Sequence, residues 1–86
     1  MILLFDVGNT TVGFGISDGI NILETYKLNT EVSKTADEYW IQMRSLIPIE
    51  QIDKIAISSV VPRITEKLKE ISEKHFKLEP LIIGPG

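Results

Sequence analysis

The chain has 86 residues, 43% of them hydrophobic, and a formal net charge of −3. This length accommodates one domain with a buried core, but not two. The absence of cysteine excludes disulfides, zinc ribbons and thiol nucleophiles, and the scattered lysines and arginines argue against a nucleic-acid partner or an anionic membrane surface.

The chain begins Met-Ile-Leu-Leu-Phe-Asp, which lacks the basic region of a signal peptide. No apolar stretch approaches the length of a membrane span. We therefore expect a soluble, cytoplasmic protein.

Three strands are predicted in the first third of the chain. Ile2–Phe5 is a continuous apolar run, typical of a central strand covered on both faces. From Val12 to Ser17, large apolar residues alternate with glycine and serine, which predicts a second strand. Asp18-Gly19 is a two-residue hairpin signal, and the third strand continues from Ile20 to Leu28.

A helix is predicted after these strands. Thr35 and Glu38 have the spacing of a capping box, in which each side chain bonds the backbone amide of the other residue. Apolar residues then recur at helical spacing until Pro48 ends the helix. These residues are Ala36, Tyr39, Trp40, Met43, Leu46 and Ile47.

A strand, a helix and a last short strand complete the chain. Residues 52–61 are rich in β-branched side chains, and Pro62 suits the first turn of the helix that follows. The helix has an apolar face of Ile64, Leu68, Ile71 and His75 or Phe76. Its wetter side carries two pairs in the favourable i,i+4 order, Glu70–Lys74 and Glu73–Lys77. Leu81–Ile83 is the last strand, and Gly84-Pro85-Gly86 closes the chain.

The predicted order is therefore βββαβαβ, an α/β fold with a mixed five-stranded sheet and two helices. Helical crossovers make the strands near residues 4, 57 and 82 parallel. The two strands after Asp6 form the antiparallel edge.

A glycine-containing turn follows the first strand, at the sheet edge where ligands of α/β proteins gather. Asp6 ends that strand, and Ser58-Ser59 end the neighbouring one. The turn from Val7 to Thr11 offers successive backbone N–H groups, two threonine hydroxyls and a glycine that permits close approach. This combination is suited to binding a phosphate.

The turn contains no lysine or arginine, so a polyphosphate would face Asp6 without a neutralising side chain. Mg²⁺ keeps several waters and takes one or two carboxylates together with phosphate oxygens. Asp6 is thus a candidate Mg²⁺ ligand, through water. The alternative is structural: Asp and Asn in turns bond their own backbone, and Gly13 and Gly15 would only allow close packing.

Asp6-Val7-Gly8-Asn9-Thr10 resembles the first phosphate motif of the acetate kinase, sugar kinase, Hsp70 and actin superfamily, in the form typical of type III pantothenate kinases. Further matches follow in the family's order and extend over the whole chain. They are "SDG" at 17–19, "TADEY" at 35–39, "ISSVVP" at 57–62 and "EPLIIGPG" at 79–86. Thr11 departs from the pattern, since many relatives carry Asn or His there.

The resemblance implies a ribonuclease-H-like (actin-like ATPase) fold and ATP-dependent phosphorylation of pantothenate to 4'-phosphopantothenate, the first step of coenzyme A biosynthesis. It also implies a homodimer and a requirement for a monovalent cation such as K⁺, with Mg²⁺ held at Asp6. The implied ATP-binding segment comprises Asp6, Val7, Gly8, Asn9, Thr10, Thr11, Val12 and Gly13.

Family members are longer and hold the nucleotide between two such domains. Their catalytic aspartate lies in a Gly-Ala-Asp-Arg segment beyond the matching "GPG", as do the second phosphate loop and the K⁺ ligand. We therefore expect residues 1–86 to be an N-terminal ATP-binding half-domain without the C-terminal domain, a catalytic residue or kinase activity of its own. The alternative is a non-catalytic nucleotide-binding regulator or transcriptional accessory factor that shares the fold.

Other polar and aromatic side chains are interpreted as structural. Trp40 and its apolar neighbours form core or a dimer contact, and His75 lies favourably near a helix C-terminus. Asp37 and Glu38 belong to the first turn of the helix rather than to a catalytic pair. For Ser58-Ser59, a functional and a structural role both stay open.

Overall fold

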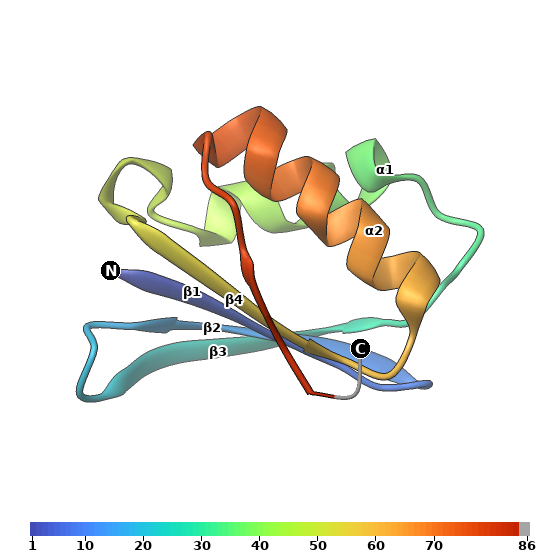
Figure 1. Cartoon of the computed structure of the whole chain (residues 1–86), viewed down its shortest axis with the longest axis horizontal. Coiled ribbons are helices and arrows are strands. Elements are labelled where there is room, and N and C mark those ends of the chain that lie inside the picture. Colours follow the sequence, from blue (N-terminus) through green and yellow to red (C-terminus); the bar gives the residue numbers. More distant parts are fainter. Residues whose placement is uncertain (85–86) are drawn as a thin grey trace.

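A computed structural model describes residues 1–84. The strands are β1 (Ile2–Val7), β2 (Thr11–Ser17), β3 (Ile22–Asn29), β4 (Lys54–Ser59) and β5 (Leu81–Ile83). They form one five-stranded sheet in the order β3-β2-β1-β4-β5 (Figure 1). β1, β4 and β5 are parallel, and β2 and β3 form the antiparallel edge. The predicted order of elements and sheet are confirmed, although the predicted Gly84-Pro85-Gly86 end lies partly outside the described residues.

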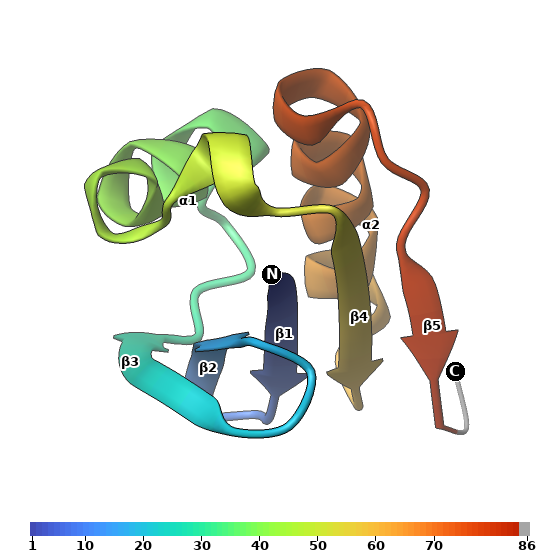
Figure 2. The same ribbon diagram turned by 90° about the vertical axis from the view of Figure 1, so that its left-hand side faces the viewer.

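Both helices cover the same face of the sheet (Figure 2). They are α1 (Ala36–Met43) and α2 (Pro62–Ile71). Two 3-10 turns follow α1 (Arg44–Leu46 and Ile49–Gln51), and a π-helical turn extends α2 (Ser72–Phe76). None of the helices within residues 1–84 has the length and apolar content needed to cross a bilayer.

The core lies between the helices and one face of the sheet. Leu3, Phe5 and Val7 of β1 point into it, whereas Leu4 is half-buried and Asp6 is exposed on the opposite face. The expectation that β1 is covered on both faces is therefore wrong for residues 1–84. The apolar run continues through Leu4 because the open face of the sheet is itself partly apolar.

The β2–β3 connection is longer than the predicted two-residue hairpin. The Asp18 carboxylate accepts bonds from the amides of Ile20 and Asn21, both at 2.8 Å, and this bonding lowers the pKa of Asp18. Ser17 pairs with Ile22, so the loop spans residues 18–21. Ile20, predicted to lie in the strand, stands 90% exposed at the tip. The side-chain bonds of Asp18 stabilise a wider loop than a two-residue turn.

The predicted capping box of α1 is confirmed. Thr35 Oγ1 accepts from the Glu38 amide at 3.1 Å, and Glu38 Oε1 accepts from the Thr35 amide at 3.0 Å. The α-helix ends at Met43, before Pro48, because the chain tightens into a 3-10 turn and Ile47 is already extended. Residues before proline disfavour the α conformation, so the helical pattern stops short of it.

The two ion pairs predicted along α2 do not form among residues 1–84. Lys74 instead lies 3.3 Å from Asp37 of α1. The π-helical turn from Ser72 explains this, because side chains four residues apart no longer stack where the helix widens. The ion pair of Lys74 therefore links α1 to the end of α2, instead of linking successive turns of α2.

Candidate functional site

Asp6 and Ser58 lie side by side at the carboxyl edge of the sheet. β1 and β4 pair in register, with Asp6 opposite Ser58 and Val7 opposite Ser59. The places of Asp6 and Ser58 at neighbouring strand ends are as predicted, and both residues are exposed on the open face of the sheet. Ser59 is buried, and its hydroxyl bonds both the amide and the carbonyl of Val61, at 3.0 and 3.1 Å, ahead of α2. The two serines thus have different surroundings, and only Ser58 accompanies Asp6.

The turn from Gly8 to Thr10 leaves backbone donors unused. The Gly8 amide bonds the Thr11 carbonyl at 2.9 Å and thereby closes the turn. Within residues 1–84, the amides of Asn9 and Thr10 donate to no protein acceptor, and both residues are exposed. The turn can therefore offer N–H groups to an anion. The structural alternative, in which Asp6 or Asn9 bonds nearby backbone, is not seen in this part of the chain.

A hollow on the open face of the sheet adjoins Asp6. Asp6 of β1 lies opposite Gly13 of β2, which lies opposite Lys27 of β3. The hollow has a volume of about 330 Å³ and is also lined by Leu4 and Ile22. Asp6 and Lys27 are the charged residues among those that line it, and most of the others are apolar.

Lys27 is the residue that sequence reasoning missed. The turn itself has no basic side chain, yet the pairing of β2 with β3 brings this lysine to the hollow that Asp6 also lines. Only the strand register places Lys27 there. The four-residue loop at 18–21 and the one-residue register shift between Ile16 and Ser17 together set that register, and a two-residue hairpin would have changed it.

The two glycines of β2 differ in what surrounds them. A Cβ at Gly15 would lie 3.2 Å from the Glu24 carbonyl oxygen, so close packing against β3 explains this glycine. A Cβ at Gly13 would make only ordinary contacts, 3.5 Å from the Asp6 carbonyl oxygen and 4.0 Å from Asp6 Cβ. Gly13 therefore keeps space open beside the Asp6 side chain.

Asp6 is suited to hold a hydrated Mg²⁺ together with a phosphate. Its carboxylate forms no ion pair within residues 1–84 and stands exposed next to the space above Gly13. No group of three or more His, Cys, Asp or Glu residues in this part of the chain could cage a metal. A single carboxylate is nevertheless enough for Mg²⁺ when waters and phosphate oxygens complete its shell.

Comparison with known proteins identifies the family. Residues 2–86 match the family model of type III pantothenate kinase. The chain belongs to the type III pantothenate kinase family. It is 46% identical over 86 residues to the type III pantothenate kinase of Acholeplasma laidlawii (strain PG-8A). It is 37% identical over 91 residues to that of Exiguobacterium sp. (strain ATCC BAA-1283 / AT1b).

The chain spans about a third of the length of those relatives. All of it aligns, but it covers only 35% and 36% of the two proteins. Its fold also resembles the solved structure of the Aquifex aeolicus PPX-GPPA enzyme, with a TM-score of 0.53 at 17% identity. That similarity covers 98% of this chain and 36% of the other. The predicted ribonuclease-H-like fold, a mixed five-stranded sheet with two helices, is thereby confirmed.

Proposed function

We propose that this chain binds the phosphates of Mg-ATP in a kinase that converts pantothenate to 4'-phosphopantothenate. The observation that supports the proposal most is the pairing of an exposed carboxylate, Asp6, with a turn whose Asn9 and Thr10 amides are free of protein acceptors. Asp6 would hold Mg²⁺ through water, and the segment from Val7 to Gly13 would contact the nucleotide. Mg²⁺ supplies positive charge between the carboxylate and the phosphates.

The proposed division of labour follows from the length of the relatives. Residues 1–86 would be the N-terminal ATP-binding half-domain of a two-domain kinase, and the catalytic base would lie outside them. The chain alone would then bind nucleotide without transferring phosphate. A K⁺ requirement and a homodimer stay predictions that rest on the family resemblance. A cytoplasmic location stays a prediction that rests on the sequence.

Titration of the chain with ATP in the presence of Mg²⁺ tests the site. Asp6→Asn keeps the size of the side chain and removes its charge, so we expect binding at least about tenfold weaker, or about 1.4 kcal/mol. The control is Asp53→Asn, an equal change of charge at an exposed residue that lies before β4 and contacts the Met1 amino group at 3.4 Å.

Isothermal titration calorimetry of the three proteins, with and without EDTA, decides the outcome. The difference between the wild type and Asp6→Asn should disappear when EDTA removes Mg²⁺. Equal affinity of Asp6→Asn and the wild type in Mg²⁺ would show that Asp6 holds no bridging cation.

A further inference from the structure

We propose that Thr30 is a positioning residue for the turn between β1 and β2, held in place by Tyr39 of α1. The inference rests on the proposed function, because the turn is there assigned to phosphate binding. Thr30 follows β3 directly and lies twenty residues further along the chain than Thr10, so no sequence motif links the two.

Thr30 bonds two carbonyl groups of the turn. Its amide donates to the Thr10 carbonyl at 2.9 Å, and its hydroxyl donates to the Gly8 carbonyl at 2.8 Å. The first bond continues the β2–β3 ladder by one residue, and a threonine is not needed for it. The second needs a hydroxyl on this residue, which makes the side chain of Thr30 specific to the turn.

These bonds fix the direction of the neighbouring N–H groups. In a planar trans peptide unit, the C=O and the following N–H point in opposite directions. Because the Gly8 and Thr10 carbonyls point to Thr30, the amides of Asn9 and Thr11 point away from it. A phosphate that takes the Asn9 amide, one of the two unused donors of the turn, would therefore meet an N–H group that is already oriented, which reduces the entropic cost of ordering the turn on binding.

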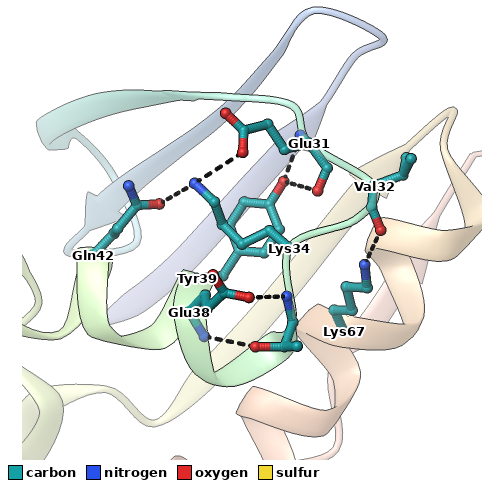
Figure 3. A network of polar contacts seen from close by, with 8 residues as sticks. Glu31, Val32, Lys34, Glu38, Tyr39, Gln42 and Lys67 are labelled. Carbon is teal, nitrogen blue, oxygen red and sulfur yellow. Dashed lines mark hydrogen bonds and ion pairs between the residues drawn. The ribbon is translucent and has the colours of Figure 1, made fainter.

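Tyr39 anchors the residue next to Thr30. Its hydroxyl accepts from the Glu31 amide at 2.8 Å and donates to the Glu31 carbonyl at 3.0 Å (Figure 3). The Tyr39 side chain is fully buried in the core, so its hydroxyl is a fixed point. The chain of contacts runs from the core through Tyr39 and Glu31 to Thr30 and the turn.

Contacts from both helices hold the rest of this connecting segment. The Lys67 ammonium of α2 donates to the Val32 carbonyl, as Figure 3 shows. The Lys34 ammonium donates to Gln42 Oε1 at 2.8 Å and lies 3.7 Å from Glu31 Oε2. The segment from residue 30 to residue 34 is thus bonded to both helices and, through Thr30, to the turn.

The test compares variants that lose a threonine hydroxyl group. In one the lost hydroxyl bonds the turn, and in the other it bonds a carbonyl elsewhere. Thr30→Val removes the bond to Gly8 and keeps the β-branched shape, while Thr30→Ser restores the hydroxyl. Thr65→Val is the matched control, because Thr65 Oγ1 also donates to a backbone carbonyl, that of Val61, at 3.3 Å, but inside α2. Tyr39→Phe removes the anchor one step further away.

Amide hydrogen exchange, followed by NMR, measures how firmly the turn is held in the absence of any ligand. We expect Thr30→Val to speed exchange of the Gly8 and Thr30 amides about three- to tenfold relative to the Ile57 amide, the range that one lost hydrogen bond implies. Tyr39→Phe should act in the same direction. In Thr30→Ser and Thr65→Val, the ratio of the Gly8 and Thr30 exchange rates to the Ile57 exchange rate should stay near the wild-type value. An unchanged ratio in Thr30→Val would overturn the proposal whatever the nucleotide does.

Mg-ATP titration of the same proteins separates this inference from the proposed function. We expect about three- to tenfold weaker binding for Thr30→Val and near wild-type binding for Thr30→Ser and Thr65→Val. If Thr30→Val binds like the wild type while Asp6→Asn binds weakly, the positioning role is wrong and the phosphate site stands. If the wild type itself binds no Mg-ATP, the proposed function and the positioning role for nucleotide both fail.

Discussion

At the scale of single residues, His75 has surroundings that its position in the sequence did not indicate. Its position near a helix C-terminus was expected to favour a charged imidazole. Instead, the ring stacks on Trp40, with ring centroids 4.2 Å apart and an angle of 12° between the ring planes. Nε2 is buried, with no hydrogen-bond partner in residues 1–84. Burial, followed by the nearby Lys74, lowers the pKa of His75, and Asp37 opposes this only in part. The neutral ring is therefore the form that fits.

This arrangement predicts that stability falls as the pH drops below about 6.5, the ordinary pKa of histidine. The unfolded chain then binds a proton that the folded chain takes up less readily, so protonation favours unfolding. The free energy of unfolding in urea, followed by the fluorescence of Trp40, should be lower at pH about 5.5 than at about 7.5. The pKa values of Asp18 and Glu38 are also lowered, from ordinary values of 3.8 and 4.5. These two carboxylates therefore affect stability only at a lower pH than His75 does.

The control is His75→Phe, which keeps an aromatic ring against Trp40 and cannot titrate. Its stability should change much less over the same interval of pH. An equal loss of stability in the wild type and in His75→Phe would assign the effect to another group. Lys77 and Arg44 also face His75 and add to the lowering of its pKa.

At the scale of elements, what the sequence predicted depends on how local each signal is. The capping box of α1 involves residues three apart, and the structure confirms both of its bonds. The turn after β1 was also recognisable, because Asp6 lies just before it and Gly8 begins it. The bonds of Thr30 to that turn and the place of Lys27 beside Asp6 depend on how β2 pairs with β3. That pairing is set by the loop at 18–21 and by the register shift between Ile16 and Ser17, neither of which the Asp18-Gly19 pattern revealed.

The sequence did not reveal that the helices cover only one face of β1, for a different reason. A continuous apolar run does not distinguish a strand with helices on both faces from one whose second face is open and partly apolar. Leu4 lies on that open face, opposite Gly15 and Ala56. The end of α1 was missed by a few residues because the apolar spacing continues to Pro48 while the chain tightens into a 3-10 turn after Met43. The apolar spacing of α2 also did not indicate the π-helical turn from Ser72.

Within β2, we predict that Gly15→Ala destabilises the fold and that Gly13→Ala does not. The added Cβ at residue 15 would lie 3.2 Å from a backbone oxygen of β3, and relief of that contact requires the strands to shift. Such overpacking costs about 1–3 kcal/mol. At residue 13 the closest atom is at an ordinary 3.5 Å, so alanine should change stability by less than about 1 kcal/mol in either direction.

Urea unfolding of the two variants measures this difference, and each is the control for the other because both add one methyl group to the same face of β2. A larger loss for Gly13→Ala than for Gly15→Ala would mean that the β2–β3 spacing is wider than described. Equal losses would show that the 3.2 Å contact at residue 15 adds no specific cost.

At the scale of the whole molecule, the two edges of the sheet differ in how well they resist pairing with another chain. β3 exposes charged side chains, among them Glu24 and Lys27, which discourage strand addition. β5 exposes Leu81, Ile82 and Ile83, at 65%, 38% and 48%. Unprotected apolar edge strands offer free N–H and C=O groups to a second strand. The β5 edge is therefore the part of the described surface where this chain should associate with itself.

We predict that the chain self-associates as its concentration rises and that Leu81→Lys reduces this association. A lysine on β5 would place like charges together when two such edges pair, and it would remove the apolar area that pairing buries. The control is Ile41→Lys on α1, an equal change of charge at a residue 62% exposed and away from the sheet edge. Sedimentation equilibrium should give a lower mean mass for Leu81→Lys than for the wild type or Ile41→Lys. A wild type that stays monomeric would refute edge pairing, and an equal decrease in both variants would indicate general charge repulsion instead.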